Sequence, residues 1–79
     1  MTLKAEFTVE PFHPGEPGPH VQAALDAATA AGLAVEFGPF GSVVQGDDEL
    51  VVETLGAVLR SSVANGATRV SVQVVTVTD

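Results

Sequence analysis

The chain has 79 residues, of which 46% are apolar and 16% charged, with no cysteine and a formal net charge of −7. This length allows one domain, residues 1–79, and the composition favours a globular fold over a disordered chain. The lack of cysteine excludes disulfides and thiolate chemistry. Lys4, Arg60 and Arg69 are the only Lys and Arg residues. The clustered positive charge that binds phosphates is therefore missing, and nucleic acid is not an expected partner.

No stretch of the sequence reaches the roughly 20 consecutive apolar residues that span a bilayer. The first ten residues, MTLKAEFTVE, also lack the charged-then-apolar layout of a signal peptide. We therefore expect no membrane association and a cytoplasmic location. Because the apolar residues are mostly Ala and Val, one chain offers a thin core. We expect a homo-oligomer, a dimer or tetramer, that shares a sheet face or edge.

The first third of the chain predicts a strand and then a helix. Residues 3–10 alternate apolar and polar side chains, the pattern of a half-buried strand. Prolines at positions 11, 14, 17 and 19 then interrupt any strand. Gly18-Pro19 indicates a helix start and Gly32 a helix end. The face expected to be buried carries Val21, Ala24, Leu25 and Ala28.

The middle of the chain predicts two strands and a second helix. Residues 33–37 and 40–45 read as strands joined by a turn at Gly38-Pro39. Asp47 or Asp48 suits the N-cap of the helix, and an αL-competent Asn65-Gly66 pair ends it. Glu49 complements the dipole of the first turn. The buried stripe is expected at Val51, Leu55, Val58, Leu59 and Ser62 or Val63.

Residues 68–78 predict a last strand. Its valines at 70, 72 and 74 are in phase, and the phase then moves to Val75 and Val77, which suggests either a bulge or a face used by another subunit. The order β-α-β-β-α-β predicts an α+β, ferredoxin-like domain with a four-stranded antiparallel sheet and two helices on one face. The open face would carry Glu6, Thr8, Glu10, Ser71 and Gln73.

Catalytic patterns are missing from the sequence. It has no Ser/His/Asp or Cys/His arrangement and no Gly-rich phosphate loop, so we expect no catalytic residues and not an enzyme. His13 and His20 would need further ligands such as Glu16 to hold a metal, and we interpret both as surface-loop residues. The acidic run at residues 47–49 is interpreted as a helix cap. No metal or cofactor is expected.

Three segments, AEFTVEPF, VEFGPFGSVVQGD and GATRVSVQV, together resemble the thiamine-binding protein family of small MTH1187/YkoF-like ferredoxin-like domains. The resemblance spans nearly the whole chain. It implies a non-catalytic, usually oligomeric protein that binds thiamine or its hydroxymethylpyrimidine part. By position, Thr8 and Ser42 take the hydroxyl positions of the family and Gly38-Pro39 the turn. Gln45 departs from the family, because many members carry Glu there.

The chemistry of thiamine gives these residues roles. A flat aminopyrimidine joined to a cationic thiazolium needs an aromatic wall, a few polar groups and nearby negative charge. Phe37 and Phe40 flank the turn and can supply the wall. Gln45 can both donate to and accept from the pyrimidine. Thr8 and Ser42 can each add a hydrogen bond, and Glu10 or Glu6 can offset the positive charge.

Two other classes of function are open at this stage. One is a regulatory domain of the same fold that binds another metabolite, such as an amino acid, between subunits. The other is a structural module that uses its open sheet face to bind a protein partner. The phenylalanines can equally be core or interface residues, and the two hydroxyl residues can be ordinary sheet positions.

Overall fold

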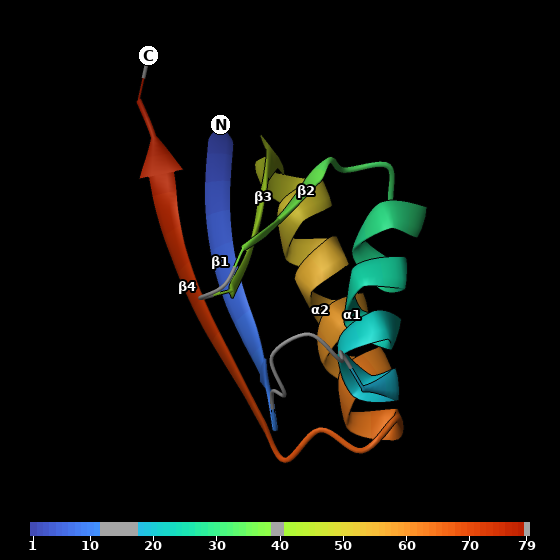
Figure 1. Cartoon of the computed structure of the whole chain (residues 1–79). Helices are drawn as coiled ribbons and strands as arrows, with labels where there is room; N and C mark the ends of the chain where they lie inside the picture. Colours follow the sequence, from blue (N-terminus) through green and yellow to red (C-terminus); the bar gives the residue numbers. More distant parts are fainter. Residues whose placement is uncertain (12–17, 39–40, 79) are drawn as a thin grey trace.

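The computed structural model describes residues 1–11, 18–38 and 41–78. The elements are β1 (Thr2–Glu10), α1 (Pro19–Ala30), β2 (Val35–Gly38), β3 (Gly41–Asp47), α2 (Asp48–Ala64) and β4 (Arg69–Val77). The strands form one antiparallel sheet in the order β2-β3-β1-β4, and both helices lie on one face of it (Figure 1). The predicted ferredoxin-like α+β fold is confirmed.

The central strand β1 divides the sheet into a helix-covered face and an open face. Its odd-numbered residues, from Leu3 to Val9, are buried under the helices, whereas Lys4 and Glu6 are exposed on the other side. This is the alternation that the sequence predicts. The main core is contributed by Leu3, Ala5, Phe7, Val9, Val21, Ala24, Ala28, Leu33, Val44, Val51, Leu55 and Val58.

The helix ends follow the local sequence. Pro19 opens α1, and Gly32, at φ +90°, donates its N–H to the Thr29 carbonyl oxygen at 3.0 Å. Gly66, at φ +102°, supplies the left-handed residue after α2. Neither α1 nor α2 has the length and apolar character that a membrane-spanning helix needs.

The N-terminus of α2 differs from the expected side-chain cap. Asp47 occupies the N-cap position, but its side chain makes no capping hydrogen bond. The first turn instead carries Asp48 and Glu49, whose negative charge complements the positive end of the helix dipole. The Asp48 N–H donates to the Met1 carbonyl oxygen at 2.9 Å, so a backbone group satisfies that donor.

The buried stripe of α2 was predicted only in part. Leu59 is 42% exposed, so its assignment to the core was wrong. Of the two alternatives at the end of the stripe, Ser62 is buried and Val63 is 62% exposed. The stripe also contains Thr54, which was not predicted; Thr54 and Ser62 are 1% and 0% exposed. These two hydroxyls can be buried because each donates to the carbonyl oxygen four residues earlier, at 2.7 and 2.6 Å.

Strand β4 carries valines on both faces without a bulge. Its register with β1 is unbroken from Thr2↔Val77 to Glu10↔Arg69, so the bulge interpretation was wrong. Val72 and Val74 share the helix face, while Val75 and Val77 lie on the open face. Because β4 is an edge strand that extends beyond the helices, Val72, Val74 and Val75 remain 39%, 43% and 50% exposed (Figure 1).

Candidate functional site

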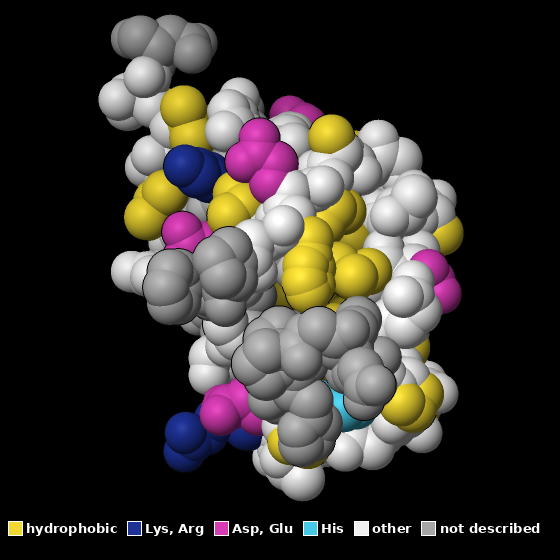
Figure 2. Space-filling view, viewed as in Figure 1, with side chains coloured by type: hydrophobic (Ala, Val, Ile, Leu, Met, Phe, Trp, Pro, Cys, Tyr) yellow, Lys and Arg dark blue, Asp and Glu magenta, His cyan; other side chains and the backbone are white. Residues whose placement is uncertain are grey.

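A cavity of about 320 Å³ lies between α1 and the hairpin end of the sheet. Strand β1 contributes residues 7–10, the β2–β3 hairpin contributes Phe37, Gly38, Gly41 and Ser42, and α1 contributes Val21 and Leu25. Figure 2 shows apolar side chains exposed at the surface in this region, in the centre of the view. The cavity is therefore open to solvent and mainly apolar.

The cavity exists because the strands have different lengths. The pairing of β3 with β1 ends at Phe7↔Ser42, and the hairpin turns back after Gly38↔Gly41. The pairing of β1 with β4 continues to Glu10↔Arg69. Among the described residues, β1 therefore has no partner on its β3 side beyond Gly41, and the cavity beside residues 9 and 10 forms a notch that α1 closes from one side.

The hairpin needs glycine at position 41. This residue has φ +149°, and a Cβ there would lie 3.0 Å from the Phe7 carbonyl oxygen and 3.1 Å from the Thr8 Cγ2. The backbones of β3 and β1 therefore approach each other closely at the edge of the cavity. A larger residue would displace one wall of the site.

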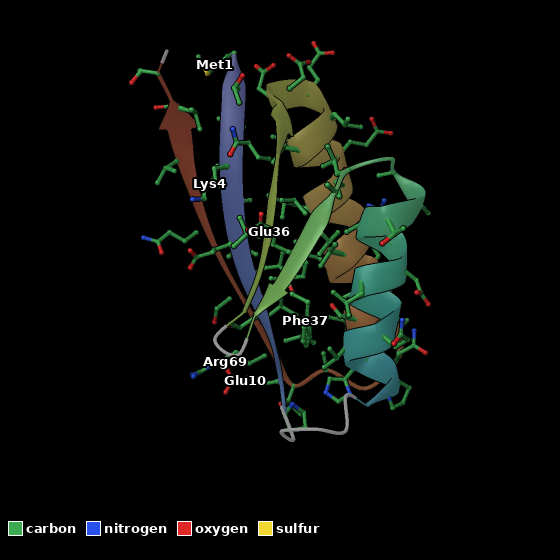
Figure 3. All side chains as sticks on the ribbon, turned by 45° about the horizontal axis from the view of Figure 1, so that its top comes forward. Met1, Lys4, Glu10, Glu36, Phe37 and Arg69 are labelled. Carbon is green, nitrogen blue, oxygen red and sulfur yellow. The ribbon has the colours of Figure 1, made fainter. Side chains whose placement is uncertain are left out.

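Three side chains form a row across the helix face of the sheet. Phe37 pairs with Ser42, and Ser42 pairs with Phe7, so the hydroxyl residue lies between two phenyl rings. Phe7 is 2% exposed, Ser42 is 6% exposed, and Phe37 is 44% exposed. Figure 3 shows the Phe37 side chain in the space between the sheet and α1. Phe37 thus forms an accessible aromatic wall.

Ser42 differs from the other buried polar side chains in where its polar atom goes. His20, Thr54 and Ser62 each bond to a main-chain carbonyl oxygen. The Ser42 hydroxyl forms no side-chain hydrogen bond within the described part of the chain, and the residue lines the cavity. No fully buried polar side-chain atom of the described residues lacks a partner. The Ser42 oxygen therefore reaches the cavity, where it can donate or accept.

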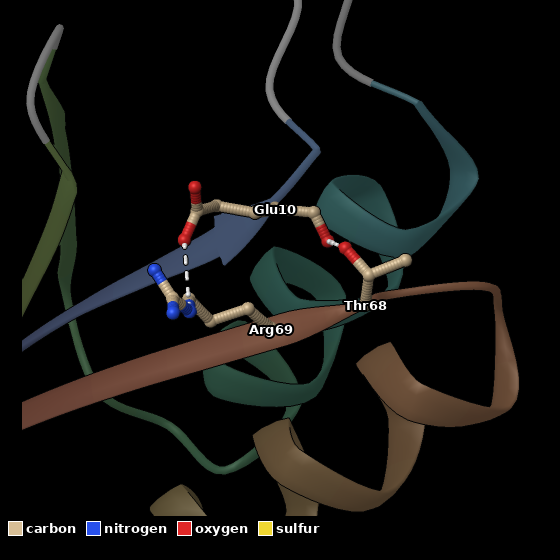
Figure 4. Close-up of polar contacts among 3 residues, drawn as sticks. All are labelled: Glu10, Thr68 and Arg69. Carbon is tan, nitrogen blue, oxygen red and sulfur yellow. Dashed lines mark hydrogen bonds and ion pairs between the residues drawn. The ribbon is translucent and has the colours of Figure 1, made fainter.

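Glu10 gives the cavity its charge. It is the one ionisable residue among the described lining residues. Its carboxylate lies 3.9 Å from the Nε of Arg69, and its carbonyl oxygen accepts from the Thr68 N–H at 2.8 Å and hydroxyl at 3.2 Å (Figure 4). The side chains of Glu10 and Arg69 are 46% and 74% exposed, so this ion pair is weak. As an even-numbered residue of β1, Glu10 directs its side chain toward the open face, away from Ser42.

The structure brings five of the predicted site residues together around this cavity: Thr8, Glu10, Phe37, Gly38 and Ser42. Pro39 and Phe40 lie outside the described residues. Gln45 does not line the cavity, because it is exposed on the open face opposite Lys4. The expected convergence of Gln45 with Ser42 is therefore corrected. Residues three apart on one strand point to opposite faces.

Thr8 belongs to the open face as well. It also lines a second cavity of about 180 Å³, together with Glu6, Ser71 and Gln73. Glu6 and Thr8 are even-numbered residues of β1, and Gln73 and Ser71 are their partners on β4. Four of the five polar residues predicted on the open face therefore line one cavity, which lies on the other side of the sheet from Ser42; Glu10 is not among its described lining residues.

Sequence reasoning missed the residues of β1 and α1 that complete the main cavity. These are Phe7, Val9, Val21, Leu25 and Gly41. Four of them have the apolar pattern of core residues, and nothing in that pattern separates a cavity wall from a packed core. The pairing of Ser42 with Phe7 was the available signal, but it depends on the register between two strands distant in sequence.

His20 was wrongly interpreted as a surface-loop residue, since it is 7% exposed in the first turn of α1. Its ring Nε2 donates to the Pro11 carbonyl oxygen. A Cβ on Gly18 would lie 2.7 Å from the His20 Cε1, so the ring packs tightly against that glycine. His13 and Glu16 lie outside the described residues, and the residues that are described form no group of three His, Cys, Asp or Glu side chains able to hold a metal.

Solved structures with the same fold can be identified, whereas no protein-family model and no curated protein matches the sequence. A domain of unknown function, DUF77, from Bacillus cereus aligns with TM-score 0.70 and 17% identity, covering 94% of this chain and 72% of that one. A hypothetical protein from Methanocaldococcus jannaschii aligns with TM-score 0.64 and 24% identity, covering 92% of this chain and 75% of that one.

A third similar structure comes from Thermotoga maritima and is provisionally named a thiamine biosynthesis/salvage protein. It aligns with TM-score 0.57 and 19% identity, covering 94% of this chain and 80% of that chain. At these identities the similarity establishes a shared fold. It does not transfer a ligand or an activity to this chain.

Proposed function

We propose that this chain is a non-catalytic small-molecule-binding protein whose cavity binds thiamine or its hydroxymethylpyrimidine part. The observation that carries the proposal is the Ser42 hydroxyl, which lies on a residue only 6% exposed and faces an apolar cavity beside Phe37. The hydroxyl reaches the solvent-open cavity, where it can donate to or accept from a ligand in place of water.

The size and lining of the cavity suit a flat ring. Its volume of about 320 Å³ is at the lower end of the roughly 300–1,000 Å³ typical of ligand sites. Phe37 offers a face for stacking, and Val21 and Leu25 of α1 line the cavity with it. The name of the Thermotoga maritima protein supports the same class of ligand.

The charge of the site favours an unphosphorylated ligand. Glu10 can offset the thiazolium charge, and no Lys or Arg occurs among the described lining residues. The chain as a whole carries a formal net charge of −7. Thiamine diphosphate would add negative charge to this site, so we expect it to bind more weakly than thiamine.

Titration calorimetry tests the proposal with thiamine, hydroxymethylpyrimidine, thiamine diphosphate and a panel of amino acids. We expect saturable binding of the first two at one ligand per chain. Binding of an amino acid alone would identify a regulatory domain of another ligand class. No heat from any member of the panel at millimolar concentration would leave the fold as a structural module.

We also propose that the chain forms a homo-oligomer through β4. No described strand pairs with the outer edge of β4, and Val72, Val74 and Val75 are exposed on its two faces. A long apolar edge strand readily pairs with another strand. Pairing with a second copy would cover these valines and add apolar burial to a thin core.

A further inference from the structure

The main-chain N–H and C=O groups of successive β1 residues point alternately toward β3 and toward β4. The Phe7 carbonyl oxygen points toward β3, because it lies 3.0 Å from the position of a Cβ on Gly41. The Glu10 carbonyl oxygen points toward β4, where it accepts from the Thr68 N–H. In an antiparallel strand the N–H and C=O of one residue point the same way and alternate along the chain. Both groups of Val9 therefore point to the β3 side.

On that side Val9 borders the notch, and no described residue of a neighbouring strand pairs with it. The β3 residues that pair with β1 end at Ser42, opposite Phe7, so within the described part of the chain Val9 has no β3 partner. Val9 lines the cavity, and its side chain is 6% exposed on the helix face. Among the described residues of β1, the N–H and C=O of Val9 are consequently the main-chain groups that point toward the cavity without a strand partner.

This open edge is one residue long. Strand β1 ends at Glu10, and the residue that follows, Pro11, has no N–H. The Pro11 carbonyl oxygen accepts from the ring of His20. Because one donor and one acceptor remain among the described residues, the edge offers too little pairing for an added peptide strand, which needs a row of such groups. A small molecule needs no more than this.

We propose that the Val9 main chain selects the ligand of this cavity by pairing with a planar ring that carries an acceptor next to a donor. An aminopyrimidine is such a ring: its ring nitrogen accepts from the Val9 N–H, and its exocyclic amine donates to the Val9 C=O. The inference deepens the proposed function and rests on it. It assigns to the backbone the two-point recognition that Gln45, on the opposite face, does not provide in this cavity.

The stacking wall and the hydroxyl complete this arrangement. A ring that pairs with Val9 lies in the notch, with Phe37 and Ser42 on the hairpin side and Val21 on α1. The selected class therefore extends beyond thiamine to flat rings with an amidine or primary amide edge. Rings that lack the donor, the acceptor or both are disfavoured, because an unpaired main-chain group would then be covered.

Amide NMR of the uniformly ¹⁵N-labelled chain tests the inference without any mutation. Titrants are 4-amino-2-methylpyrimidine, 2,4-dimethylpyrimidine and nicotinamide. With the aminopyrimidine we expect the Val9 amide to show one of the largest shift changes and slower exchange with solvent. We expect 2,4-dimethylpyrimidine, in which a methyl group replaces the amine, to bind about tenfold more weakly.

A pair of variants tests the donor itself. Val9→Pro removes the N–H on the β3 side and leaves the β4 side of the strand unchanged, and Val9→Ala trims the side chain but keeps the N–H. We expect the aminopyrimidine to bind about tenfold more weakly to Val9→Pro than to Val9→Ala. If Val9→Pro does not fold, as judged by circular dichroism, the NMR titration of the wild-type chain decides.

The outcomes separate the inference from the proposed function. Shifts at Phe37 and Ser42 without a change at Val9, or equal affinity for the two pyrimidines, would overturn the inference and keep the binding function. Nicotinamide bound at Val9 with both pyrimidines silent would overturn the thiamine proposal and keep the recognition by the strand edge. No shift with any of the three compounds would overturn both.

Discussion

Removing the Ser42 hydroxyl should change ligand binding without changing stability. The Ser42→Ala variant loses one oxygen from a residue that is 6% exposed and lines the cavity. Because this hydroxyl makes no side-chain hydrogen bond within the described residues, its loss should change the free energy of unfolding by less than about 0.5 kcal/mol. A hydrogen bond to the ligand, in contrast, is worth about 1 to 1.4 kcal/mol, so Kd should rise about five- to tenfold.

Thr54→Ala is the matched control. Thr54 is also buried, at 1% exposure, but its hydroxyl donates to the Leu50 carbonyl oxygen at 2.7 Å and it does not line the cavity. We expect this variant to lose about 1–2 kcal/mol of stability and to keep its Kd. For a domain of this size the loss lowers Tm by about 4–16 °C, against less than about 4 °C for Ser42→Ala.

Calorimetric titration with hydroxymethylpyrimidine and thermal unfolding followed by circular dichroism give the two readouts. Gln22→Ala, on the exposed face of α1, serves as a surface control with unchanged Kd. An unchanged Kd in Ser42→Ala, or the same loss of affinity in all three variants, would show that the hydroxyl does not contact the ligand.

Three further predictions concern the aromatic wall, the hairpin and the edge strand. Phe37→Ala should weaken binding of the pyrimidine by about 1–3 kcal/mol through lost stacking. Phe37→Tyr keeps an aromatic ring and should bind the pyrimidine nearly as well as the wild-type chain. Equal affinity of the two variants in calorimetry would exclude stacking on this ring. Gly41→Ala should lower the free energy of unfolding by about 1–3 kcal/mol, because its Cβ meets the Phe7 carbonyl oxygen. Gly66 also has a positive φ, but a Cβ there would have no neighbour within 4 Å, so Gly66→Ala should lower the free energy of unfolding by about 1 kcal/mol. A larger loss in Gly66→Ala than in Gly41→Ala, measured by chemical denaturation, would contradict the close approach of Gly41 to Phe7. Light scattering at micromolar concentration should give the mass of a dimer or tetramer, reduced by Val75→Lys on the β4 edge; a monomeric wild-type chain would refute the oligomer.

The architecture was predictable because each element has its own local signal. Alternation in residues 3–10, the Gly18-Pro19 start and the Gly66 end all depend on neighbours in sequence, and the structure confirms them. The errors in α2 have another cause. Thr54 is buried because the helix backbone accepts its hydrogen bond, so hydrophobicity alone overlooks Thr54 and assigns Leu59 to the core.

The site was predictable to the extent that it follows from the hairpin. Phe37 and Ser42 lie opposite each other because a two-residue connection joins Gly38 to Gly41. The placement of Ser42 and Gln45 on opposite faces of the sheet was also predictable, because the two residues are three apart on one strand. The notch at Val9 was not, because it depends on β3 ending before β1 does, and on a contact between His20 and Pro11. Such features arise only when distant segments pack.

A crystal structure of the chain with hydroxymethylpyrimidine bound tests the central claim most directly. Our account places the ring between the hairpin and α1, stacked on Phe37, with its polar edge at Val9 and Ser42 within hydrogen-bond distance. A ring found instead on the open face of the sheet, beside Gln45 and Lys4, would contradict it.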